Sequence, residues 1–120
     1  MKLILTISAL LLLSGCSHIP SFWDDNEALL AADIRFAVTQ IKCERPYQSK
    51  VENLKDKVDL LAIYSDSKGS SDVGEIITIM KETTDGFYED NSQNEFFCNM
   101  KKRLLTDQSK HVAQAIMGRY

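Results

Sequence analysis

Apolar residues recur at helical spacing in four separate stretches of this chain, and no stretch alternates with the two-residue period of a strand. The spacing predicts helices over residues 25–43, 49–68, 72–91 and 92–118, joined by short connections. Short connections favour antiparallel neighbours. We therefore predict an all-α fold, a small four-helix bundle with up-down-up-down topology.

The ends of these helices carry capping signals. Asp24 is a good N-cap with Glu27 three residues later, and the pairs Ser49–Glu52 and Ser92–Glu95 have capping-box spacing. Lys68-Gly69 predicts a helix end, because a cation favours the last carbonyl groups and glycine accepts the left-handed cap conformation.

The first fifteen residues are typical of a signal peptide. Lys2 supplies the positive charge, and residues 3–13 form an apolar segment that is too short for the roughly 20 residues needed to span a bilayer. The stretch Leu13-Ser14-Gly15-Cys16 resembles the lipobox of bacterial lipoproteins. An ordinary signal peptide with a chance cysteine is the alternative.

The lipobox resemblance implies cleavage before Cys16 and acylation of that residue, which anchors the protein stably in a membrane. The chain then divides into a signal peptide at 1–15, a lipidated tether at 16–23 and a helical domain at 24–120. By resemblance to enterobacterial sorting rules, Ser17 favours the outer membrane, and we expect the protein to face the periplasm. Phe22 and Trp23 could lie at the lipid headgroups, but we expect them to pack on the core.

Charge gives no support for a nucleic-acid partner. The whole chain has a formal net charge of -3, and removing the signal peptide with its one charge, Lys2, gives -4. This is neither a basic footprint for nucleic acid nor a polybasic patch for anionic lipid. We expect the lipid to hold the protein at the membrane.

Once Cys16 is acylated, Cys43 and Cys98 remain. Because the periplasm is oxidising, we predict a disulfide between them, with two buried free thiols as the alternative. In the predicted topology these residues lie at the same pole of the bundle, opposite Cys16.

Catalytic and metal-binding patterns are missing from the sequence. His18 and His111 are not near a cysteine nucleophile or in a zinc-protease motif, and the acidic stretch from Asp85 to Glu95 lacks the glycine and ligand spacing of a calcium loop. We expect no enzyme activity, no metal and no cofactor, and a function in binding another protein.

Three stretches resemble the type II secretion pilotins of the all-helical kind: AVTQIKCERP with Cys43, YSDSKGSSDV with the Lys68-Gly69 turn, and ETTDGFYEDNSQNEFFCNMKKRL with Tyr88 and Cys98. The resemblance implies an outer-membrane lipoprotein that binds a C-terminal segment of a secretin subunit as a helix in a groove. The lipoprotein sorting machinery would carry both. Apolar residues of the first and third helices are the groove candidates: Ile34, Val38, Ile76, Met80, Phe87 and Tyr88.

A different class of function fits the same features. A non-enzymatic phage- or plasmid-type envelope lipoprotein could occlude a receptor, act in surface exclusion or bridge the membranes in lysis. Neighbouring genes distinguish the two: secretin and secretion-ATPase genes favour a pilotin, whereas phage or conjugation genes favour the alternative.

Overall fold

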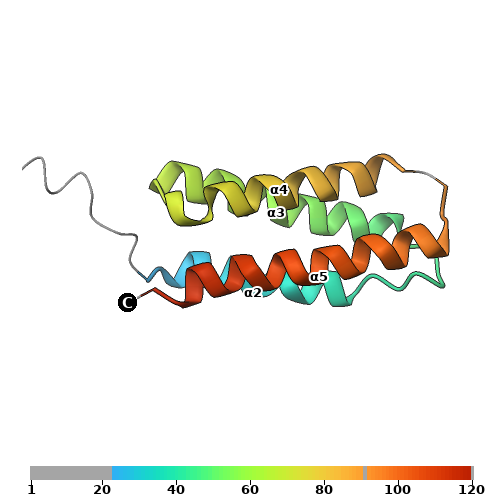
Figure 1. Cartoon of the computed structure of the whole chain (residues 1–120), viewed down its shortest axis with the longest axis horizontal. Helices are drawn as coiled ribbons and strands as arrows, with labels where there is room; N and C mark the ends of the chain where they lie inside the picture. Colours follow the sequence, from blue (N-terminus) through green and yellow to red (C-terminus); the bar gives the residue numbers. More distant parts are fainter. Residues whose placement is uncertain (1–22, 91, 120) are drawn as a thin grey trace, which may run out of the picture.

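Four helices make up the bundle in the computed structural model, which describes residues 23–90 and 92–119. They are α2 (Asp25–Thr39), α3 (Gln48–Lys68), α4 (Ser71–Glu89) and α5 (Glu95–Met117). Each helix packs against two others, α2 with α3 and α5, and α4 with α3 and α5. The chain runs up and down along the bundle (Figure 1), which confirms the predicted all-α fold.

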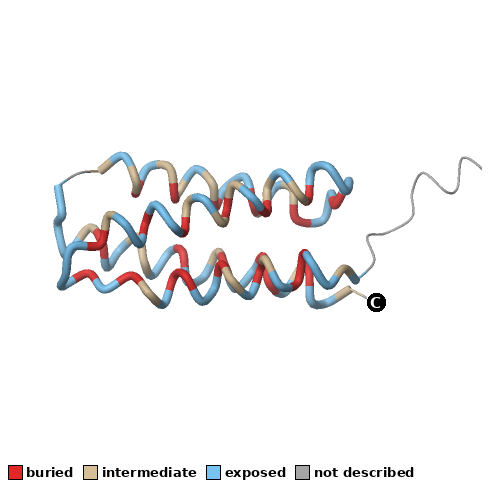
Figure 2. Tube along the Cα trace, turned by 180° about the vertical axis from the view of Figure 1, so that it is seen from behind, coloured by how far each residue is buried: buried red, intermediate tan, exposed pale blue. Residues whose placement is uncertain are grey.

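The core follows the predicted helical stripes. Buried residues lie on the inward side of every helix (Figure 2), and burying such a side chain stabilises the fold by about 1.5–3 kcal/mol. The fully buried aliphatic side chains include Ile34, Leu54, Leu61, Met80, Leu105 and Ile116.

The first helix is shorter than predicted. α2 ends at Thr39, four residues before Cys43, because the N–H groups of Gln40 and Ile41 turn back to the carbonyl groups of Ala37 and Val38. The freed segment folds inward instead, and Ile41, Cys43 and Tyr47 are buried. Its apolar residues therefore fill the core from a loop, which helical spacing could not reveal.

Both predicted capping boxes are wrong. The N-cap of α3 is Tyr47, which makes no side-chain cap bond, so Ser49 lies in the first turn. The N-cap of α5 is Asn94, whose side chain accepts from the N–H of Phe97 at 3.0 Å, while Ser92 donates to Asp90. Asp24 does cap α2. At the end of α3, Gly69 has the predicted left-handed conformation, with φ 81°.

The predicted signal peptide, the lipidation residue Cys16 and the tether up to Phe22 lie outside the described residues. None of the described helices is both long enough and apolar enough to cross a membrane.

Candidate functional site

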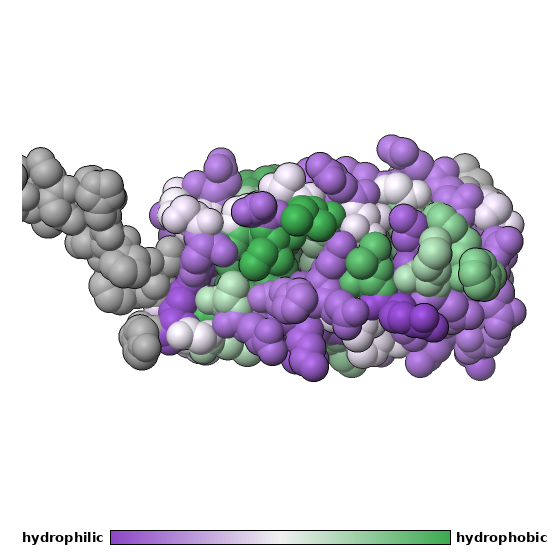
Figure 3. Space-filling view, viewed as in Figure 1, coloured by the Kyte–Doolittle hydropathy of each residue, from purple (hydrophilic) through white to green (hydrophobic). Residues whose placement is uncertain are grey.

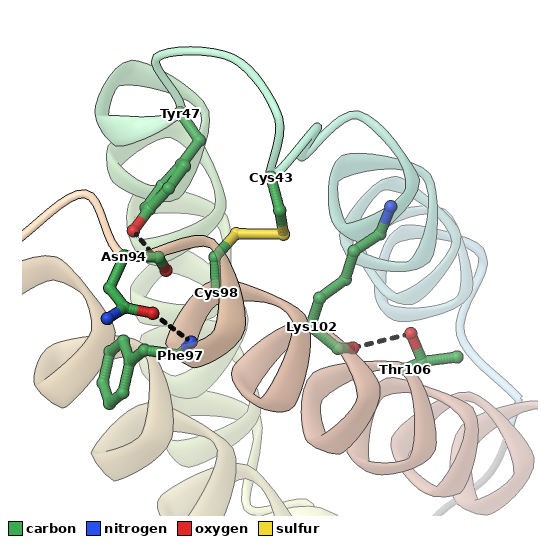
Figure 4. Close-up of a disulfide and its surroundings, with 7 residues drawn as sticks. All are labelled: Cys43, Tyr47, Asn94, Phe97, Cys98, Lys102 and Thr106. Atoms are coloured by element: carbon green, nitrogen blue, oxygen red, sulfur yellow. Dashed lines mark hydrogen bonds between the residues drawn. A yellow bond between two sulfur atoms is a disulfide. The ribbon is translucent and has the colours of Figure 1, made fainter.

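One pole of the bundle is closed by the predicted disulfide, which is confirmed (Figure 4). Cys43 in the α2–α3 connection is bonded to Cys98 in the first turn of α5, with their Cα atoms 5.6 Å apart. The Tyr47 hydroxyl donates to the carbonyl group of Asn94 at 3.3 Å, and burial raises the pKa of Tyr47. The phenol therefore remains a neutral donor that helps to fix this pole.

The opposite pole holds a buried charge cluster around Glu27, whose side chain is fully buried. Its carboxylate accepts from Lys68 at 2.6 Å, from Arg119 at 3.0 Å, and from the hydroxyl groups of Ser65 and Ser70 at 3.1 and 2.9 Å. These contacts bring together α2, the end of α3, the α3–α4 turn and the C-terminal segment.

The charges around Glu27 favour its ionised form. Burial raises the pKa of Glu27, but the hydrogen bonds from Arg119 and Lys68 outweigh it and hold the pKa below its usual value. Arg119 also donates two bonds of 2.7 Å to Asp72. Because Glu27 stays ionised and its charge is compensated, it is poorly suited to donate or accept protons in catalysis.

The sequence did not reveal this cluster. Glu27 has the spacing of a capping residue, yet its side chain points inward to cations from distant parts of the chain. Arg119 follows the last helix and carries no local signal of burial.

The position of Trp23 differs from the prediction that it packs on the core. Its side chain is 46% exposed and donates to Asp25 at 2.6 Å, so it does not pack in the core. Phe22 lies outside the described residues.

The groove candidates are mostly inside the bundle. Ile34, Val38, Met80 and Phe87 are at most 2% exposed and are enclosed by the core. They do not line an open groove, because the inward stripes of the four helices pack against one another. Ile76 and Tyr88 are partly buried against that core.

An open apolar surface lies elsewhere, along the junction of α4 and α5. It consists of Ile76 and Ile79 on α4 and of Phe97, Met100 and Leu104 on α5; we call it the α4–α5 strip. Ile79, Met100 and Leu104 are 49%, 48% and 44% exposed. Figure 3 views this face, where hydrophobic side chains gather along the junction. A hydrogen bond of 2.9 Å from Gln108 to Thr83 joins the two helices there.

Charges are distributed unevenly around α4. Toward α3, Lys55, Asp59, Lys81 and Asp85 form a network with N–O distances of 2.9 to 3.7 Å. Near the strip, Glu75, Glu82 and Glu89 are exposed and spaced seven residues apart. None of these three carboxylates forms an ion pair with another described residue. We call them the acidic ridge.

Comparisons with known proteins give no relative: no family model, no curated protein and no solved structure matches this chain. Within residues 23–90 and 92–119, no group of three or more His, Cys, Asp or Glu side chains could hold a metal ion. Among the described residues, the α4–α5 strip is one candidate site for a partner.

Proposed function

We propose that this chain is a lipid-anchored envelope protein that acts as a pilotin, binding a secretin subunit and guiding it to the outer membrane. The observation that carries the proposal is the lipobox-like Leu13-Ser14-Gly15-Cys16, which ends seven residues before the first described residue, Trp23. Acylation of Cys16 would fix a binding domain to the membrane by one end.

The arrangement of the bundle supports a tethered role. The chain enters and leaves at the same pole, close to the Glu27–Arg119 pair (Figure 1). The disulfide closes the far pole. With the lipid at the entry pole, the long sides of the bundle stay accessible to a partner.

A helical partner suits this surface. The α4–α5 strip is an elongated apolar surface between two antiparallel helices, and such surfaces accept amphipathic helices. A secretin segment that folds as it binds would lose conformational entropy, which lowers its affinity and keeps the binding reversible. The lipoprotein sorting machinery would move the pair to the periplasmic face of the outer membrane.

The proposal is tested by deleting the gene and measuring, by membrane fractionation, how much secretin of the same cell reaches the outer membrane. We expect secretin multimers to disappear from the outer membrane and to return when the gene is restored. A Cys16→Ser variant should not restore them, and it should lose incorporation of a palmitate analogue. Multimers that still reach the outer membrane in normal amount after deletion would reject the pilotin function.

A further inference from the structure

A buried amide joins the two helices that carry the α4–α5 strip. Gln108 donates through Nε2 to Thr83, but its Oε1 is buried and has no hydrogen-bond partner among the described residues. Buried acceptors are usually satisfied. This acceptor is closed off from solvent, so it lies beneath the surface and offers no contact to a molecule on the strip.

A glycine beside the strip has no role in the fold. Gly86 lies seven residues after Ile79, on the same side of α4, and a Cβ added there would meet nothing within 4 Å. A glycine inside a helix costs about 1 kcal/mol relative to alanine. No internal contact requires a glycine at this position. Because Gly86 has no side chain, the backbone of another helix can approach α4 closely there.

The acidic ridge runs along the same helix. Glu82 is three residues from Ile79 and four from Gly86, so it borders the strip directly. Its neighbours in the ridge, Glu75 and Glu89, are each two helical turns away, at about 10.5 Å along the axis. Packed helices place their flanking charges in register at this same seven-residue interval.

We propose that the α4–α5 strip binds a helix with an apolar face and with Lys or Arg at every seventh position along one flank. The apolar face would cover Ile79, Met100 and Leu104, and the basic flank would lie against the acidic ridge. This inference rests on the proposed function, because it names the chemistry of the bound segment.

Charge decides against a membrane surface as the occupant. Anionic lipid would be repelled by Glu75, Glu82 and Glu89, whereas cationic side chains on a helix would be attracted to them. A basic flank in register with the ridge would also fix the position of the helix along the strip.

Two synthetic helical peptides of about three heptads each test this inference. They share one leucine face and differ only in one flank, which carries Lys in the first peptide and Glu in the second. Their affinity for the full-length, detergent-solubilised lipoprotein is measured by fluorescence anisotropy at low salt. We expect the Lys peptide to bind at least about tenfold more tightly. Equal affinities would overturn the proposal.

Charge reversal on the protein locates the contact. Glu82→Lys should abolish or invert the preference for the Lys peptide. The control Glu52→Lys makes the same change at an exposed position of α3 and should keep most of the preference. An equal loss in both variants would mean that only net charge matters, and it would overturn the assigned surface.

Steric blocking gives a second, independent readout. Gly86→Leu should weaken binding of the Lys peptide by at least about tenfold. The control Gly74→Leu adds the same side chain to the α3-facing side of α4, where a Cβ also meets nothing within 4 Å. It should leave binding unchanged. Dimers in light scattering that Gly86→Leu disrupts would instead assign the strip to a second copy of this chain.

In cells, the two proposals fail differently. If gene deletion leaves the secretin in place but the purified protein still prefers the Lys peptide, the pilotin function is rejected and the binding chemistry stands. If the secretin depends on this protein but is unaffected by Glu82→Lys and Gly86→Leu together, the strip is rejected and the pilotin function stands.

Discussion

Glu27 in the first turn of α2 and Arg119, just after α5, form an ion pair of 3.0 Å across 92 positions of the chain. Both side chains are at most 3% exposed. The pair joins the beginning and the end of the described fold at one pole of the bundle.

Removing the cation should be costly. In Arg119→Met, Glu27 keeps Lys68 and two hydroxyl groups but loses one charged partner, so we expect the free energy of unfolding to fall by about 3 kcal/mol. Urea denaturation measures this loss. The control Arg103→Met removes an exposed arginine and should change stability by less than about 0.5 kcal/mol. Similar losses in both variants would contradict a stabilising role of the Glu27–Arg119 ion pair.

Acid should destabilise the fold. The hydrogen bonds from Arg119 and Lys68 to Glu27, and from Lys55 and Lys81 to Asp59, outweigh burial and hold the pKa of both carboxyl groups below their usual values. A lowered folded-state pKa adds stability that is present above the unfolded-state value and is lost as pH falls through the folded-state value.

We therefore expect a nearly constant free energy of unfolding from neutral pH down to about pH 5, and a decline below it. Urea titrations at stepwise lower pH measure this profile. In Glu27→Gln the decline should be smaller, because one of the carboxyl groups with a lowered pKa is gone. A profile that stays flat down to about pH 3 would show that these ion pairs contribute nothing.

The disulfide should provide a large share of the stability. It links residues 55 positions apart, and closing a loop of this size stabilises by about 4 kcal/mol in the chain-entropy model. Cys43→Ser with Cys98→Ser should lower the urea midpoint accordingly. Mass spectrometry after alkylation without reductant checks the bond in the native protein: labelling of Cys43 and Cys98 would show that it had not formed.

Two substitutions compare an observed N-cap, Asn94 of α5, with a capping box inferred from sequence at Ser49 of α3. Asn94→Ala should cost about 1 kcal/mol, because its side chain caps the N–H of Phe97. Ser49→Ala, at the other misassigned cap, should cost much less, since Ser49 lies in the first turn of α3 and is exposed. Thermal denaturation compares them. A larger loss for Ser49→Ala would favour the capping box inferred from sequence.

Much of the fold could be predicted from the sequence, because helix periodicity and glycine signals depend on neighbouring residues. The four helices, their order and the turn at Gly69 follow from spacing and composition. The pairing of Cys43 with Cys98 was predicted from the oxidising compartment that the lipobox resemblance implies. The inward stripes also identified the core. They did not reveal an open groove, since the most regular apolar positions, such as Val38 and Phe87, are those the bundle itself buries.

Local sequence therefore determined the helices, and only the tertiary structure decided how residues far apart in the chain meet. In the sequence, Glu27 has only the spacing of a capping residue. The fold places Lys68 and Arg119 against its carboxylate. Ile79 and Leu104 belong to two different helices, and they share one surface only because α4 packs beside α5. The physical reason is that burial and ion pairing depend on distances in space, which the spacing of residues along one helix does not contain.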